Sequence, residues 1–320
     1  MKRMYRKAFT LVEILVSILI LGVVMSAVMT LFFSVFESYK FHQDIMEAKQ
    51  RGQVAIAAIQ PYISASALGL PNRETPFQTA FTTTGGVLKT ASALLPANVQ
   101  EKFTGPVQIA SSTIIAGNTV DIIVPGVVNS DDISGPGLWL VYAVPSGIGV
   151  ENDYDIDSTG TEIELTAVPP ANLFIKDTNT MKSWVSFPGS TAPMFVNAVN
   201  PSDGKKVTLA ARSAQKISAF DEMHYVRAVK IKVDGNSNMV VKHLADGLAV
   251  NEPWNSVVEG IEDMLVEFTA DRILRVTVLG KGSVRHNVEY MSEIAGWDGP
   301  RPADMHYRYA AVSRSWRIRN

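Results

Sequence analysis

A long uncharged segment near the N-terminus constrains this chain more than any other feature. From Ile14 to Phe36 the sequence holds no charged residue, and the run exceeds the roughly 18 apolar residues that indicate a membrane-spanning helix. It is also longer than the roughly 7–15 residue apolar core of a cleaved secretory signal. We therefore expect one helix that crosses a membrane.

A single acid begins this segment. Glu13 directly precedes the apolar run, and a carboxylate is costly in hydrocarbon, so Glu13 is a functional-site hypothesis. A short basic leader comes before it, with Lys2, Arg3, Arg6 and Lys7. Basic residues before a span place the N-terminus in the cytoplasm, so we expect the rest of the chain to be exported from the inner membrane.

Residues 7–13 read Lys-Ala-Phe-Thr-Leu-Val-Glu, which resembles the signal of type IV pilins and type II secretion pseudopilins. The family pattern of Phe, Thr, Leu, any residue and Glu is matched by Phe9, Thr10, Leu11 and Glu13. The resemblance implies that a prepilin peptidase cuts between Ala8 and Phe9, and that Phe9 becomes the N-methylated first residue. Ala8 stands where the family usually has Gly.

The resemblance also implies a role for Glu13 in assembly. In the family mechanism this acid pairs with the amine of Phe9 on a neighbouring subunit. Losing one member of an ion pair in low dielectric leaves an uncompensated charge, so the pair would set the register of docking. The alternative is an interfacial acid without a partner.

Small or weakly polar residues recur every four positions in the apolar segment. On a helix they share one face, and small residues let membrane helices approach closely. This stripe predicts helix packing inside a filament, while the alternative is an ordinary anchor that tolerates such residues. The stripe consists of Gly22, Ser26, Thr30 and Ser34.

The apolar segment continues into an amphipathic one. Apolar residues recur at spacings of three and four, which is a helical period, at Phe41, Ile45, Ala48, Gly52, Ala55, Ile56, Ile59 and Ile63. Polar residues, among them Asp44, fill the other side. We expect one helix from about Phe9 to about Tyr62, broken by the stretch that begins at Gly69. The expected parts are a leader (1–8), a membrane half (9–36), an amphipathic half with its break (37–71) and an exported β-rich domain (72–320).

Beyond the helix, short apolar runs alternate with turn residues. A helix followed by strands predicts an α+β fold, with a long N-terminal helix packed on an antiparallel β-rich domain. In the clearest hairpin, Val229, Ile231 and Val233 alternate with lysines, which predicts a half-buried strand. The stretch Gln78–Pro106 is interpreted as loop-rich. Strands are expected at Thr119–Val124, Leu138–Val144, Thr161–Val168, Leu173–Lys176, Met194–Val199, Lys206–Ala210, Tyr225–Val233, Met239–His243, Met264–Ala270 and Ile273–Leu279.

The later chain carries a looser resemblance. The order of its segments is similar to PilW-like minor pilins and J-type minor pseudopilins, in which a strand pair precedes a Gly-acid segment, an aromatic strand and a Ser-rich strand that closes in Arg-Asn. Residues 72–220 match no family pattern. The segments are Met223–Arg227, Val240–His243, Val257–Phe268, Ile273–Leu279 and Tyr307–Asn320.

One acidic loop has the spacing of a calcium site. Counting from Asp153, acids fall at positions one, three, five and twelve, at Asp153, Asp155, Asp157 and Glu164, as in an EF-hand. Ser158 occupies the position where that loop needs Gly, and the residues after it alternate like a strand. A β-hairpin turn with solvated acids is the favoured alternative, so calcium is at most a weak possibility and no other cofactor is expected.

The remaining composition argues for a structural protein. The chain has no cysteine, and no nucleophile elbow, HExxH or phosphate-binding loop is present, so no enzyme is expected. The C-terminal stretch mixes Arg with aromatic residues, which can bind single-stranded nucleic acid. With a net charge of -2, an edge strand with exposed Arg is the favoured interpretation, and nucleic acid is an unlikely partner.

These patterns together predict a minor pilin or minor pseudopilin. Its expected partners are other minor and major pilins or pseudopilins, the prepilin peptidase and the inner-membrane assembly platform. It would prime or cap a type IV pilus or a type II secretion pseudopilus. The alternative is a signal-anchored exported binding or adhesin domain that never enters a filament.

Overall fold

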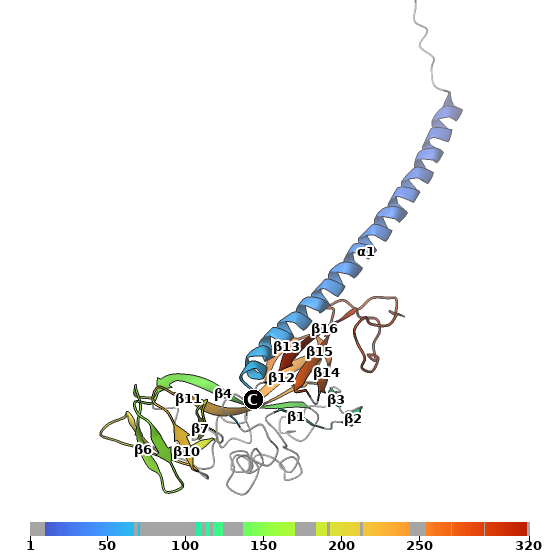
Figure 1. Ribbon diagram of the computed structural model, residues 1–320. Coiled ribbons are helices and arrows are strands. Elements are labelled where there is room, and N and C mark those ends of the chain that lie inside the picture. Colours follow the sequence, from blue (N-terminus) through green and yellow to red (C-terminus); the bar gives the residue numbers. More distant parts are fainter. Residues whose placement is uncertain are drawn as a thin grey trace, which may run out of the picture.

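The computed structural model has one long helix packed on antiparallel β-sheets (Figure 1), which confirms the α+β fold. The structure describes residues 10–66, 70, 107–110, 113–115, 118–123, 137–169, 184–190, 193–211, 214–243, 254–269, 271–290 and 292–318. The predictions for Leu173–Lys176 and Gln78–Pro106 lie outside these residues.

Helix α1 covers Leu11–Ala65 and is close to the predicted length. It continues one turn past Pro61 and ends where the backbone N–H of Ser66 donates to the carbonyl of Ile63 at 3.1 Å. Only its second half packs on the domain, through Asp44, Ala48, Gly52, Ala55, Ile56, Ile59 and Ile63. The predicted apolar stripe is therefore confirmed except at Phe41 and Ile45, which are only partly buried.

The strands of the described residues form three antiparallel sheets. The largest has nine strands, in the order β1-β4-β11-β7-β8-β9-β6, with β12 on β11 and β13 on β12. These are β1 (Val107–Ala110), β4 (Gly137–Gly149), β6 (Thr161–Glu164), β7 (Trp184–Ser186), β8 (Met194–Val199), β9 (Lys206–Ala210), β11 (Glu222–Val233), β12 (Asn238–His243) and β13 (Asn255–Glu259).

The second sheet has five strands in the order β16-β15-β14-β3-β2, and β10 and β5 form a small third sheet. The strands of the second are β2 (Thr113–Ile115), β3 (Asn118–Ile123), β14 (Ile261–Phe268), β15 (Ile273–Lys281) and β16 (Tyr309–Arg317). The third consists of β5 (Tyr154–Ile156) and β10 (Gln215–Ile217).

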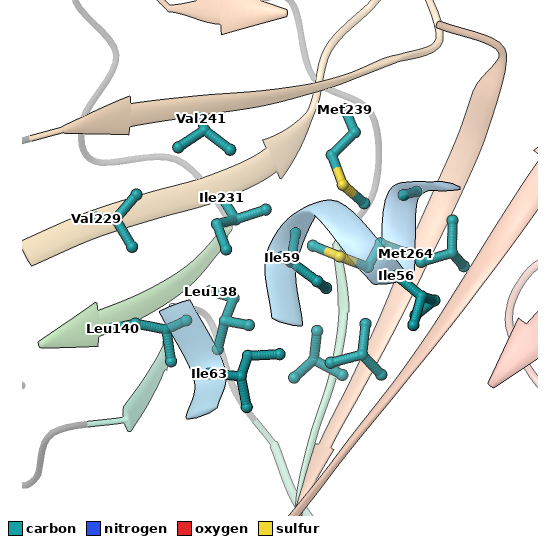
Figure 2. Packing of buried hydrophobic residues seen from close by; sticks show 14 of the residues in the cluster. Ile56, Ile59, Ile63, Leu138, Leu140, Val229, Ile231, Met239, Val241 and Met264 are labelled. Atoms are coloured by element: carbon teal, nitrogen blue, oxygen red, sulfur yellow. The ribbon is translucent and has the colours of Figure 1, made fainter. Parts of the chain in front are cut away.

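The main core lies between α1 and the two large sheets (Figure 2). Figure 2 shows Ile56, Ile59 and Ile63 of α1 among side chains from β4, β11, β12 and β14, and all of them belong to one buried cluster. The helix therefore ties the two sheets together. A second cluster around Phe187 and Met223 fills the far part of the nine-stranded sheet, away from α1.

The predicted hairpin forms, but its first strand is not half-buried. Val233 of β11 pairs with Met239 of β12 as expected. However, Lys230 and Lys232 are 0% and 5% exposed, so both faces of this strand are covered. Their ammonium groups lie 5.0 Å and 4.4 Å from the ring centres of Trp139 and Trp254. The prediction was wrong because a lysine can bury its stem against an aromatic ring.

Candidate functional site

The first half of α1 is a free apolar rod. Its apolar side chains are exposed, with Leu11 80% and Leu31 68% exposed, and its most apolar stretch has no buried residue. Among the described residues this is the one helix long and apolar enough to cross a membrane. Figure 1 shows it extending away from the sheets. A surface of this kind requires a bilayer or other helices around it.

Glu13 caps the start of this helix. Its carboxylate accepts from the backbone N–H of Thr10 at 2.8 Å, and its own N–H donates to the Thr10 hydroxyl at 3.3 Å. This reciprocal pair is a capping box, and it places a negative charge at the positive end of the helix dipole. Within one chain Glu13 therefore has a structural role. Ala8 and Phe9, the predicted processing site, lie outside the described residues.

The small-residue stripe lies on the exposed rod. Gly22, Ser26, Thr30 and Ser34 are all exposed. A side chain added at Gly22 would meet no atom within 4 Å. The Thr30 hydroxyl donates to the Ser26 carbonyl at 2.9 Å, which satisfies that hydroxyl inside the helix. The stripe is thus available to a neighbouring helix, and packing against one stays a prediction.

A polar clamp that sequence analysis missed fixes where the rod leaves the domain. Asp44, predicted on the polar side, is only 2% exposed. It accepts from the backbone N–H of Val284 at 3.2 Å and lies 3.0 Å from Nε2 of His286. Two turns on, Arg51 donates to the carbonyl of Lys281 at 2.9 Å. Spacings of four and three place Asp44, Ala48 and Arg51 on one helix face. This spacing is the sequence feature from which the clamp could have been predicted.

The four carboxylates of the acidic loop whose spacing resembles a calcium site are not brought together. Among the described residues, no group of three or more His, Asp or Glu side chains has an arrangement that could hold a metal ion. Asp153 accepts from the backbone N–H of Ala219 at 2.7 Å, and Asp155 pairs with Lys216 at 3.4 Å. Glu164 lies in β6.

Asp157 closes the turn of this loop. Its carboxylate accepts from the Thr159 hydroxyl at 2.6 Å and from the backbone N–H groups of Thr159 and Gly160 at 2.8 Å and 3.1 Å. These bonds, the Thr159 hydroxyl first, lower the pKa of Asp157. The predicted turn is present, but its flanking strands do not form a hairpin. Instead, β5 pairs with β10 and β6 pairs with β9.

The C-terminal basic stretch forms an edge strand, as expected. β16 pairs with β15 on one side, and Arg314 donates to the side chain of Gln60 on α1 at 2.6 Å. Arg308 departs from the expectation of exposed arginines, because its side chain is only 6% exposed. Arg319 lies outside the described residues.

Comparison with known families bears on the N-terminus. The family model described as "Prokaryotic N-terminal methylation motif" matches residues 3–29, which include the capping box and the start of the apolar rod. The motif indicates a type IV pilin-like protein. An N-methylation motif with a long apolar helix fits a membrane-anchored pilin, and it implies contact with prepilin peptidase and other pilins. No curated protein and no solved structure matches the chain.

Proposed function

We propose that this protein is a minor pilin or minor pseudopilin of the PilW-like or J-type kind. Its work is structural rather than catalytic. It is held in the inner membrane by α1, cut between Ala8 and Phe9, and built into a type IV pilus or a type II secretion pseudopilus. The single observation that carries the proposal is an N-methylation motif on a helix whose apolar half is not covered by any part of the described chain.

The exposed rod supports a filament role. In the membrane its side chains face lipid, and in a filament they would face the rods of neighbouring subunits. The small-residue stripe supports close approach there. The domain beyond the rod exceeds what a repeating shaft subunit needs, which supports a low-copy position that primes or caps the assembly.

The capping box supports the proposed docking step. In one chain the Glu13 carboxylate is occupied by Thr10. Cleavage before Phe9 creates a new amine four residues from Glu13. When this amine enters an apolar bundle it needs a counter-charge, and the Glu13 of an adjacent subunit supplies one.

The test is the intact mass and N-terminal sequence of the protein from membranes with and without prepilin peptidase. We expect a chain that begins at N-methylated Phe9 only when the peptidase is present. Ala8→Gly, the residue usual in the family, should be processed, whereas Ala8→Arg should not. A chain cut elsewhere, or uncut in both strains, would instead leave a signal-anchored binding or adhesin domain.

A further inference from the structure

A buried arginine lies where the rod leaves the domain. Arg308 belongs to the connection between β15 and β16, which lies beside α1 (Figure 1). Its guanidinium lies beside two neighbouring rings, 4.8 Å from the centre of Phe41 on α1 and 5.6 Å from that of Tyr290. The side chain is 94% buried, so this cation has lost nearly all contact with water.

No acidic side chain of the described residues pairs with Arg308. Among the described residues Arg308 has no ion pair, and its Nε and Nη1 donate to nothing. Its Nη2 alone donates, to the carbonyl of Val288 at 3.2 Å. Arginine carries five N–H donors in a fixed fork, and a buried charge is normally paired. Within the described residues the charge of Arg308 is therefore not neutralised by an ion pair, and Nε and Nη1 are covered by neighbouring atoms.

Arg308 lines a pocket of about 500 Å³ between α1 and the segment Val284–Val288. Lys40 from α1 also lines it, and among the described residues its only charged or ring contact is with Phe36, at 4.4 Å. Arg285 in the pocket is already paired with Asp304 at 3.0 Å. One acid, Glu37, also lines the pocket, and the two cations that have no acidic partner among the described residues, Arg308 and Lys40, outnumber it.

The pocket lies at the end of the apolar segment. Its α1 lining begins at Ser34 and ends at Phe41, while the uncharged run ends at Phe36. A hydrocarbon core about 30 Å thick needs about 20 helical residues, so a span that begins near Ile14 reaches the headgroup layer at these residues. On the facing segment, Val284 and Val288 are 52% and 71% exposed. Exposed apolar side chains beside cations are typical of a membrane-surface contact.

We propose that this pocket binds the phosphate of an anionic phospholipid headgroup, with Arg308 and Lys40 as its ligands. The headgroup would hold the domain against the membrane until the subunit is extracted into a filament. This inference rests on the membrane insertion of α1 contained in the proposed function. A phosphate carries a charge opposite to that of the Arg308 guanidinium and the Lys40 ammonium that line the pocket.

The test is native mass spectrometry of the full chain in dodecyl maltoside, titrated with phosphatidylglycerol or phosphatidylcholine. We expect at least fivefold tighter retention of phosphatidylglycerol. Lys40→Gln and Arg308→Gln should each weaken that retention about tenfold. Lys216→Gln removes the same charge from the exposed β10 and should change nothing. Because Arg308 is buried, Arg308→Gln is first compared with the parent by circular dichroism. If Arg308→Gln is misfolded, the result for Lys40→Gln alone tests the inference.

Other results would overturn the inference. Equal retention of both lipids, or equal retention by Lys40→Gln and Lys216→Gln, would mean that no headgroup site exists here. If millimolar inorganic phosphate occupied the pocket while phosphatidylglycerol stayed bound at other positions of the chain, the pocket would be a site for free phosphate instead. Insertion into liposomes is measured separately. A chain that does not insert would contradict the proposed function, whereas a chain that inserts but shows no lipid preference would contradict only the headgroup site.

Discussion

At the scale of single residues, Asp263 links the stability of the domain to pH. Its carboxyl is 5% exposed in β14. Burial, opposed by a hydrogen bond from the Met264 N–H and aided by the charge of Glu262, raises the pKa of Asp263 to about 7. The folded state therefore binds this proton more tightly than the unfolded chain, whose carboxyl titrates near 4. Stability is fully present below about pH 4 and falls as the pH rises to about 7, in total by on the order of 4 kcal/mol.

Asp263→Asn removes this titration. At pH 8 we expect the variant to be more stable than the parent by about 2–4 kcal/mol, because the parent must bury a charge there. At pH 5 the difference should shrink to about 1–2 kcal/mol, since the parent carboxyl is protonated when folded. Urea unfolding of the full chain in detergent, followed by tryptophan fluorescence, measures both. Asp271→Asn, on the surface, is the control, and a gain for Asp263→Asn that is the same at both pH values would contradict the assignment.

Residue-scale burial was the part least accessible from sequence. The helical period predicted Ile56, Ile59 and Ile63 as core, because apolar residues on one face must be buried. The same period placed Asp44 on the solvent-exposed face of the helix. This was wrong because the groups that cover Asp44 lie about 240 positions away along the chain. The buried Lys230 was missed for the same reason. Local patterns identify apolar faces but not the distant partner that makes a polar residue tolerable inside.

At the scale of elements, α1 packs unusually closely on β15. Gly280 of β15 faces the backbone of α1, and a Cβ at this position would overlap the carbonyl oxygen of Ala48. On the helix, a Cβ at Gly52 would come 2.8 Å from the side chain of Val312 on β16. Two glycines thus permit the approach that buries the second half of the helix. The obstacle at Gly280 is backbone, which cannot rotate away.

Gly280→Ala should therefore separate the helix from the sheet. We expect a loss of at least about 3 kcal/mol in unfolding free energy, at the upper end for an overpacked core. The matched control is Gly149→Ala in β4, where a Cβ would meet no atom closer than 3.5 Å. Thermal unfolding of the two full-length variants in detergent compares them directly. Equal melting temperatures would show that the close contact is not needed.

Elements with long apolar runs were predictable, and very short ones were not. Met194–Val199 and Lys206–Ala210 were predicted with the observed bounds of β8 and β9. Strands such as Tyr154–Ile156 and Gln215–Ile217 have only three residues, which is too short for an alternation to appear. They are strands because they pair with each other across the fold. The pairing order of the sheets likewise depends on contacts between distant segments.

At the scale of the whole molecule, one helix serves two environments. Its second half is held by the core, by the Asp44 clamp and by the glycine contacts, so the direction of the exposed half is fixed relative to the domain. Its first half has no partner in the described chain and begins with Glu13. A rod with a fixed direction, a free surface and one charge near its tip has the properties that docking in register requires. Of the candidate site, sequence predicted the rod and the charge, but not the clamp.

The two roles of Glu13 can be separated by experiment. Glu13→Gln keeps a side chain that can accept from the Thr10 N–H, so the cap survives, but it removes the charge that would pair with the Phe9 amine of a neighbour. Thr10→Ala does the reverse, since it removes the capping hydroxyl at a cost of about 1 kcal/mol and leaves the carboxylate.

We expect both variants to reach the membrane at parental levels. Glu13→Gln should co-purify with cross-linked pilins at least tenfold less than the parent, because an amine without its counter-charge would be buried in the bundle. Thr10→Ala should co-purify normally. Quantitative immunoblotting of sheared filaments and cross-linked membranes gives both values. If Thr10→Ala were lost from assemblies while Glu13→Gln entered them, Glu13 would act as a helix cap alone, and the charge-pairing step of the proposed function would be wrong.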